Sequence, residues 1–290
     1  MTFGNVRVAV LGLGEMGSAL AGAFLDGGHP TTVWNRTPGK GEGLVAKGAK
    51  LGSTVREAVG EADVVVVNVK GASVAEDVLG QAGDALAGRA VVNLTDGTSA
   101  EVRRVAERAA GAGYLHGQIM TIAPGIGHPD ATIFYAGAEA VYERHRAALG
   151  LLSGHAPLVS GDPGVAVLYG MAVHGTMWGL LNGFLHGAAA LADEGVRLED
   201  FLERADPALS ALSGFLPVIA GEVDRGEHAT PYGALRHHLP SIEDLVRESR
   251  ARGIDTELPE YTLGLVTKAV GRGHGDDSYS RLVEHFRRSI

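Results

Sequence analysis

Short runs of consecutive apolar residues alternate with amphipathic segments through the first half of the chain. Such runs are typical of strands buried on both faces, and the Ala-rich, charged segments between them predict helices. Strands that alternate with helices form a parallel sheet covered by helices on both faces, so we predict a doubly wound α/β fold. The predicted strands are 6–11, 31–35, 63–69, 90–95, 114–120, 132–137 and 158–160. The predicted helices lie at about 54–60, 74–87 and 99–111, and one more follows the first strand as far as Leu25.

A long uncharged stretch follows this half of the chain, because residues 163–192 contain no Asp, Glu, Lys or Arg. Asp162 before Pro163 is a helix start signal and Gly195 is a stop signal, so we predict one helix of about 30 residues and roughly 45 Å. Four glycines recur at every fourth residue on one stripe of this helix: Gly175, Gly179, Gly183 and Gly187. Because each glycine lowers helix stability by about 1 kcal/mol relative to alanine, we expect another backbone to approach this stripe closely.

The remainder of the chain has helical patterns, at about 198–204, 206–224, 240–252, 258–272 and 277–288. On a single subunit these helices and the uncharged helix would expose a large apolar surface, which soluble monomers avoid. We therefore expect an all-α C-terminal domain that forms a domain-swapped homodimer, with the glycine stripe as its seam. A membrane span is the alternative, but the His and Asn residues in the stretch and the missing basic flanks disfavour it. The predicted divisions are a cofactor domain over 1–161, an interdomain helix over 162–194 and a helical domain over 195–290.

Composition narrows the classes of function. With 290 residues, 45% of them apolar, the chain is long enough for two domains with hydrophobic cores. Its net charge of −9 argues against binding to nucleic acid or to an anionic membrane surface. The chain has no cysteine, which excludes disulfides and thiolate catalysis, and its histidines match no metal-binding motif, so we expect no metal. No targeting segment is evident before the first strand, which indicates a cytoplasmic protein.

A G-x-G-x-x-G motif follows the first strand and opens the next helix, which is the context in which this motif binds dinucleotides. Gly12 allows a tight turn, Gly14 lets the backbone approach a pyrophosphate, and Gly17 lets the helix and strand pack closely. The helix N-terminus adds N–H groups and a positive dipole near the phosphates. The motif therefore predicts a Rossmann domain, with an ordinary glycine-rich turn as the alternative. The predicted contacts of this loop are Gly12, Leu13, Gly14, Glu15, Met16 and Gly17.

The end of the second predicted strand indicates which dinucleotide is bound. NAD sites usually carry an acidic residue here for the ribose 2′-OH, and this chain has none within 35–40. Arg36 and Lys40 would instead neutralise a 2′-phosphate, and Asn35 and Thr37 would hydrogen-bond to it. We therefore predict NADPH as the cofactor, with a solvated basic loop as the alternative. Ligands of such sheets lie beyond the carboxyl ends of the strands, where five more contacts are expected: Asn68, Val69, Asn93, Thr95 and Met120.

The predicted strand order and the long helix after it resemble the β-hydroxyacid dehydrogenase and 6-phosphogluconate dehydrogenase group. Those enzymes carry a lysine on this helix as the proton-transfer residue, and this chain has no lysine between Lys70 and Lys268. Oxidation of a hydroxy acid by that mechanism is therefore disfavoured. A carbonyl or hydroxy-acid dehydrogenase with a replacement for the lysine remains an alternative.

Segments along essentially the whole chain resemble imine reductases and reductive aminases. They are 12–17 with Trp34-Asn35-Arg36-Thr37, Gly117-Gln118-Ile119-Met120 with Pro124, Leu168-Tyr169, Gly183-Phe184-Leu185-His186-Gly187 and Gly273-His274-Gly275. This resemblance implies NADPH-dependent reduction of imines, or of a carbonyl and an amine, to amines in a domain-swapped homodimer. The substrate pocket would then form between the cofactor of one subunit and the helices of both.

One position departs from this family. Its members usually place Asp, Asn or Tyr after the residue that matches Tyr169, whereas this chain has Gly170, which offers no side chain for proton transfer. An iminium ion already carries its proton, so hydride delivery to a well-positioned carbon could suffice. Tyr169 and His174 are the candidate proton donors, with water as the alternative, although a lone His on an apolar helix is more often structural. An impaired NADPH-binding scaffold is the remaining alternative, and Gly170→Asp is expected to raise activity.

An uncharged, apolar pocket would suit an iminium substrate. Trp178 could attract the cation through its ring, but it is at least as well explained as core filling. Phe215 and Leu216 could reach the pocket of the partner subunit, or could pack within their own helix. The predicted substrate contacts are Ala123, Met171, Met177, Trp178, Phe215 and Leu216.

Overall fold

The computed structural model describes residues 5–37, 39–109 and 111–287. The chain forms two compact units, Met1–Gly175 and Thr176–Ile290. The boundary between them falls inside the longest helix, α7, which spans Gly164–Asp193. Each unit is therefore described by itself.

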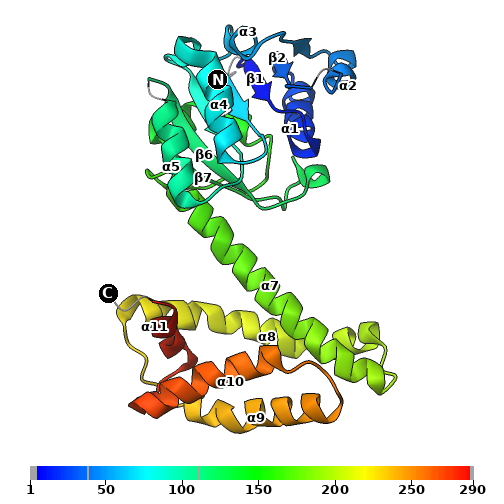
Figure 1. The fold of residues 1–290 in the computed structure, drawn as a ribbon, viewed down its shortest axis with the longest axis vertical. Coiled ribbons are helices and arrows are strands. Elements are labelled where there is room, and N and C mark those ends of the chain that lie inside the picture. The colour runs from blue at the N-terminus through cyan, green and yellow to red at the C-terminus, as the bar shows by residue number, and fades with distance from the viewer. Residues whose placement is uncertain (1–4, 38, 110, 288–290) are drawn as a thin grey trace. The chain divides into compact units, whose positions relative to one another are not determined.

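The first unit is built around a β-sheet (Figure 1). The sheet has eight strands in the order β3-β2-β1-β4-β5-β6-β7-β8. Its strands are β1 Val8–Leu11, β2 Thr31–Trp34, β3 Lys50–Leu51, β4 Val64–Val67, β5 Ala90–Asn93, β6 Gly113–Ile119, β7 Ile133–Gly137 and β8 Leu158–Ser160. Neighbouring strands are parallel except β6 and β7, which are antiparallel, so the prediction of a wholly parallel sheet was wrong there. A parallel pair needs a long crossover that is usually a helix, whereas the β6–β7 connection holds only the short 3-10 turn Ala123–Gly125.

Helices cover both faces of this sheet, as the doubly wound pattern predicted. They are α1 Glu15–Asp26, α2 Glu42–Ala46, α3 Val55–Val59, α4 Ala72–Ala82, α5 Ser99–Arg108 and α6 Glu139–Leu149, and α2 and α6 were not foreseen. Successive residues of a strand point to opposite faces, so Val8 and Val10 enter one hydrophobic core, and Ala9 and Leu11 enter the other. The continuous apolar runs of β1 and β4 are explained by these two cores.

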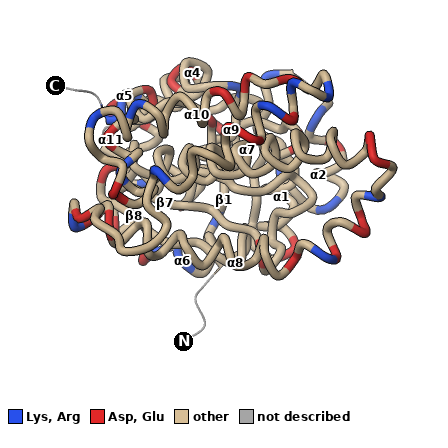
Figure 2. The backbone as a smooth tube through the Cα atoms, turned by 90° about the horizontal axis from the view of Figure 1, so that it is seen from below, with Lys and Arg blue, Asp and Glu red and all other residues tan. Residues whose placement is uncertain are grey.

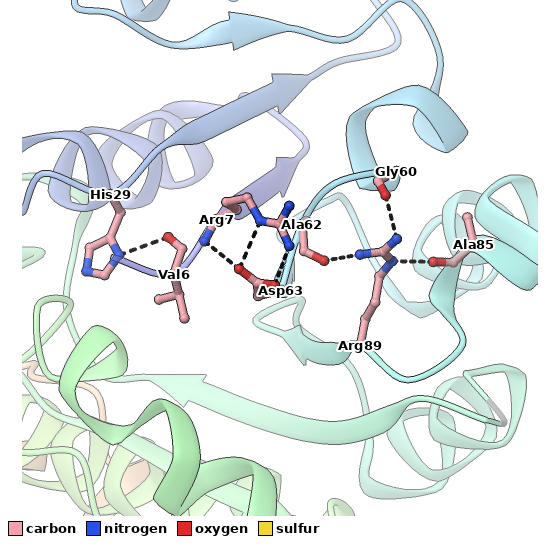
Figure 3. A network of polar contacts seen from close by, with 8 residues as sticks. All are labelled: Val6, Arg7, His29, Gly60, Ala62, Asp63, Ala85 and Arg89. Carbon is pink, nitrogen blue, oxygen red and sulfur yellow. Dashed lines mark hydrogen bonds and ion pairs between the residues drawn. The ribbon is translucent and has the colours of Figure 1, made fainter. Parts of the chain in front are cut away.

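Polar side chains tie the sheet together at the amino ends of its central strands (Figure 3). Arg7, just before β1, forms an ion pair with Asp63, just before β4, at 2.8 Å. This hydrogen-bonded pairing lowers the pKa of the Asp63 carboxyl to about 2. Arg89, just before β5, donates hydrogen bonds to three backbone carbonyl oxygens, those of Gly60, Ala62 and Ala85. These contacts join β1, β4 and β5 at their amino ends.

Helix α7 confirms both predicted end signals. The Asp162 carboxylate accepts a hydrogen bond of 2.9 Å from the N–H of Gly164 and forms an ion pair of 2.8 Å with Arg103. At the other end Gly195 has a φ of +70°, and Val196 N–H bonds back to the carbonyl of Leu191, as in a Schellman C-cap. Figure 2 marks the charged residues, and α7 carries none before Asp193.

Most of α7 has no cover within the described chain. By length and composition it is long and apolar enough to cross a membrane. Only 22% of an apolar 18-residue stretch of this helix is buried. Cβ atoms built on the four stripe glycines, Gly175, Gly179, Gly183 and Gly187, meet no described atom within 4 Å. The expected neighbour of this stripe is therefore not found among the described residues of one chain.

The second unit consists of helices (Figure 1). Beyond the end of α7 they are α8 Leu198–Arg225, α9 Leu235–Ala251, α10 Glu257–Ala269, the π-helical turn Val270–His274, the 3-10 turn Tyr279–Leu282 and α11 Val283–Phe286. Helix α8 is continuous where two helices were predicted, although Pro207 and Pro217 lie inside it. No residue of α8 is buried, so the carbonyls that these prolines leave unbonded can bind water, which lowers the cost of continuing the helix. Residue 288, the end of the last predicted helix, lies outside the described residues.

Buried groups in the second unit are few. Its core cluster consists of Leu235, Val266, Ala269 and Leu282. A polar contact supports it: buried His228 lies 2.8 Å from the Ser280 hydroxyl. So small a core is a weak basis for independent stability.

Candidate active site

The glycine loop between β1 and α1 has the geometry that its motif requires. Gly12 has a φ of +100°, and a Cβ there would lie 2.1 Å from the carbonyl oxygen of Asn68. A Cβ on Gly17 would lie 2.0 Å from the carbonyl oxygen of Gly12, so these two glycines are required by close backbone packing. Gly14 is different because nothing lies within 4 Å of its Cβ position. The open face of the loop is thus at Gly14, where a pyrophosphate would approach the N-terminus of α1.

A cavity of about 620 Å³ lies at the carboxyl ends of β1, β2 and β4. Eleven of the predicted cofactor contacts line it: Gly12, Leu13, Gly14, Glu15, Met16, Asn35, Arg36, Thr37, Lys40, Asn68 and Val69. Six lining residues were not predicted: Trp34, Lys70, Val74, Asp77, Val78 and Gln81. A sequence signal for Lys70 did exist, because it directly follows the predicted strand 63–69. The α4 residues could not be placed without knowing which face of that helix borders the cavity.

The lining of this cavity is suited to an anionic ligand. Arg36, Lys40 and Lys70 contribute three cations, against two carboxylates from Glu15 and Asp77. This balance contrasts with the net charge of −9 of the whole chain. Among the described residues Arg36 has no ion pair or side-chain hydrogen bond, so its guanidinium is available for a phosphate.

The side chain of Asn35 also has two hydrogen-bond partners within the protein. Its side-chain oxygen accepts a hydrogen bond of 3.0 Å from the N–H of Leu13, and its amide nitrogen donates one of 3.0 Å to the carbonyl of Thr37. The side chain therefore fixes the glycine loop against the end of β2. This use leaves Asn35 one free N–H, so it acts mainly by positioning the residues that surround a phosphate.

Asn93 and Thr95 lie behind the cavity and do not line it. Both are buried. Thr95 accepts a hydrogen bond from the N–H of Val69, and Asn93 accepts one from the N–H of Thr95 and donates one to the Tyr114 hydroxyl. Burial raises the pKa of that hydroxyl. Thr95 therefore holds the β4–α4 loop and Asn93 holds Thr95, and their contact with the ribose path stays a prediction.

The remaining predictions divide between the two units. Gly17 is buried beneath the glycine loop, and Met120 follows β6, where its N–H bonds to the carbonyl of Thr132. Ala123 begins the 3-10 turn after β6. The first unit also contains Tyr169, Gly170, Met171 and His174, and the second contains Met177, Trp178, Phe215 and Leu216.

Tyr169 is half-exposed, and its ring lies 5.3 Å from that of Phe134. Met171, Met177, Trp178, Phe215 and Leu216 are likewise exposed on their helices. Large apolar side chains in this condition indicate a surface that another chain or a substrate covers.

Gln118 and Asp96, two polar residues that were not predicted as site residues, lie beside Gly170. Gln118 is near the carboxyl end of β6 and is 8% exposed, and its amide nitrogen donates to the Asp96 carboxylate at 3.5 Å. A Cβ on Gly170 would lie 2.3 Å from the Cγ of Gln118. The structure therefore changes the expectation for Gly170→Asp, because an aspartate would collide with Gln118.

His116 lies on the same face of β6 as Gln118 and is fully buried. Neither ring nitrogen has a hydrogen-bond partner among the described residues. Burial lowers the pKa of His116 to about 4, while the Gln118 side chain acts in the opposite direction. The folded protein therefore holds this imidazole in its neutral form.

The pH dependence of stability should reveal this histidine. Because the pKa of His116 is lower in the folded state than in the unfolded state, the unfolded chain binds more protons between about pH 6.5 and pH 4. Stability should therefore fall through this window as the pH decreases, with a contribution of about 2 kcal/mol between pH 6.5 and pH 5. Thermal melts of the wild type and His116→Gln at both pH values would test this. An equal loss of melting temperature in both proteins would contradict it.

Comparison with known proteins identifies the family. A model of the NAD binding domain of 6-phosphogluconate dehydrogenase matches residues 7–159, and a model of the NADPH-dependent reductive aminase-like C-terminal domain matches 162–288. The NADPH-dependent reductive aminase of Aspergillus oryzae is 35% identical over 287 residues, which are 97% of each chain. The chain belongs to the reductive aminase and imine reductase family. The predicted family and the combination of a Rossmann domain with a helical C-terminal region are thereby confirmed.

Solved structures of family members agree with this assignment. The reductive aminase of Aspergillus terreus in complex with NADPH and ethyl levulinate has a TM-score of 0.87 and 35% identity, over 98% of this chain and 100% of that one. The imine reductase of Aspergillus terreus in complex with NADPH4 and dibenz[c,e]azepine has a TM-score of 0.92 and 34% identity, over 97% and 99%. These matches cover 97–98% of this chain, so the long uncharged helix α7 belongs to a fold that it shares with these enzymes.

Proposed function

We propose that this chain reduces imines and iminium ions to amines with NADPH, and that it also accepts a carbonyl compound and an amine as the source of the imine. The observation that carries this proposal is the cavity in which the open face of the glycine loop meets Arg36 and Lys40, in a chain that matches reductive aminases along its length. The absence of a lysine from α7 disfavours the hydroxy-acid dehydrogenase alternative.

The described residues provide a suitable partner for the pyrophosphate and for the 2′-phosphate of NADPH. The space in front of Gly14 admits a pyrophosphate, and the N-terminus of α1 supplies N–H donors to it. Arg36 and Lys40 would bind the 2′-phosphate, with Asn35 holding their loop in place. When bound, NADPH supplies the hydride that reduces the C=N carbon. In an iminium ion the electron pair of the C=N π bond then becomes the lone pair of the amine nitrogen, whereas a neutral imine must take up a proton as well.

The substrates proposed here are uncharged or cationic small molecules. Two relatives from Aspergillus terreus were solved with such compounds, one with cyclohexanone and allyl amine and one with dibenz[c,e]azepine. An apolar site favours them because their carbon framework is buried in it away from water. We propose that Tyr169, Gly170, His174, Met171 and Ala123 line this site.

We further propose a domain-swapped homodimer, in which Met177, Trp178, Phe215 and Leu216 of the second unit complete the substrate site. Support comes from the open glycine stripe, the small core of the second unit and the apolar side chains exposed on α7 and α8, of which Leu180 and Leu185 are each more than 60% exposed. A monomer in sedimentation experiments would contradict this part. We also propose the functional division 1–161, 162–194 and 195–290, and a cytoplasmic location.

Oxidation of NADPH in the presence of a cyclic imine tests the proposed function. With a pyrroline, the absorbance of the reduced cofactor should decay, and the corresponding pyrrolidine should appear in equal amount. NADPH alone and NADPH with a glyoxylate serve as controls. Turnover of the glyoxylate without the imine would favour a carbonyl-acid dehydrogenase. Tight NADPH binding with turnover of neither compound would indicate an impaired cofactor-binding scaffold.

A further inference from the structure

Gly170 is a glycine because of the space around it and not because of its backbone. It lies in helix α7 and does not have a positive φ, so its conformation suits any residue. A Cβ at this position would lie 2.3 Å from the Cγ and 3.0 Å from the Cδ of Gln118, where ordinary contacts are 3.4–4 Å. The side chain of Gln118 thus occupies the volume that a side chain on the helix would fill.

Gln118 is held in this place from the sheet. The register of β5 and β6 pairs Asn93 with His116, which puts Gln118 level with the first residues after β5. Asp96 lies there, and its Oδ1 accepts the long hydrogen bond of 3.5 Å from the Gln118 amide. Asp96 is exposed, and its other carboxylate oxygen has no partner among the described residues. A carboxylate with one anchored and one open oxygen therefore lies at the carboxyl edge of the sheet.

We propose that Gln118 and Asp96 together replace the polar side chain that α7 lacks at Gly170. Gln118 is a positioning residue that fills the volume and orients the carboxylate, and Asp96 binds the protonated nitrogen of the substrate. This inference rests on the proposed imine reduction. It also explains why a helix without a side chain at this position need not belong to an inactive protein.

The chemistry of Asp96 follows from the charge of an iminium ion. A carboxylate favours the protonated, reducible form of an imine over the neutral form, because opposite charges attract. The positive charge disappears as the hydride reaches carbon, so the carboxylate stabilises the bound substrate more than the transition state. The effect of Asp96 should therefore appear in KM and in the pH dependence of kcat/KM, and less in kcat.

We propose that the Gln118 side chain fills the volume that a side chain at position 170 would otherwise fill. The stability of the unliganded protein tests this. Gly170→Asp alone should lower the melting temperature by about 3–10 °C, because it overpacks a filled site. Gln118→Gly should also lower the melting temperature, because packing is lost. The double variant, with Gln118→Gly and Gly170→Asp, should recover most of the melting temperature that each single variant loses. Melting temperatures that are simply additive, or a single Gly170→Asp variant as stable as the wild type, would overturn the proposed exchange.

The role of the charge is tested with Asp96→Asn, which keeps the shape and the hydrogen-bond acceptor. With a cyclic imine, KM should rise about tenfold, as for the loss of one charged contact, and the decline of kcat/KM with pH should begin about one unit lower. Asp130→Asn, at an exposed turn, is the matched control because it removes a carboxylate that is not among the proposed contacts, and it should behave like the wild type. An unchanged KM and pH profile in Asp96→Asn would overturn this role.

The two proposals fail in different ways. If the wild type does not reduce any imine, the proposed function and the role of Asp96 are both wrong. The melting temperatures of the variants at positions 118 and 170 still show whether the Gln118 side chain fills the volume beside Gly170. If the wild type reduces imines but Asp96→Asn is unaffected, only the role of Asp96 is wrong.

Discussion

Gly14→Ala should weaken NADPH binding by about 10- to 100-fold and leave the melting temperature of the unliganded protein within about 2 °C of the wild type. Nothing lies within 4 Å of the Cβ position of Gly14, and its φ of −70° suits alanine, so the free protein accepts the methyl group. The same methyl group would project into the space in front of the loop, where a pyrophosphate must approach the backbone. Calorimetric melts without cofactor and titration with NADPH would measure the two effects separately.

Gly17→Ala is the matched control, because it adds the same methyl group to the same loop. A Cβ there would lie 2.0 Å from the carbonyl oxygen of Gly12. This variant should therefore lose stability even without cofactor, by about 1–3 kcal/mol for overpacking. If Gly14→Ala proved equally unstable, or bound NADPH as tightly as the wild type, the open face of the loop would not be the cofactor site.

The strands of the first unit could be predicted because their cause is local. A strand buried on both faces must consist of consecutive apolar residues, and β4 shows this pattern without knowledge of its neighbours. Strand β3 was missed because its two residues, Lys50 and Leu51, are exposed and carry no such pattern. The direction of β7 was also missed, since it depends on how the chain returns to the sheet and not on the composition of the strand.

The candidate site shows the same distinction. The glycines of the nucleotide loop belong to a sequence motif, and the cations at the end of β2 follow it at a known spacing along the chain. Their place in the site could therefore be predicted. Asn93 and Thr95 lie at the expected end of a strand, but their hydrogen bonds to neighbouring groups of the protein could not be predicted from the sequence. Gln118 and Gly170 are 52 positions apart along the chain. Their contact arises only in the folded structure, so it could not be predicted from the sequence.

Substituting both Arg36 and Lys40 with alanine should change the preference of the enzyme from NADPH towards NADH. Each hydrogen-bonded charge pair with a phosphate contributes about 1.5–3 kcal/mol, so binding of NADPH should weaken by at least about 100-fold. Binding of NADH should change little, because NADH has no 2′-phosphate. Lys47→Ala, in an exposed position at the end of α2 outside the cavity, is the matched control. Titrations with both cofactors at low and high salt would measure the effect. The ratio of the NADPH affinity to the NADH affinity of the wild type should decrease at high salt, because screening weakens exposed charge pairs. Equal losses for NADH and NADPH would instead place the two cations at the pyrophosphate, a group that both cofactors share.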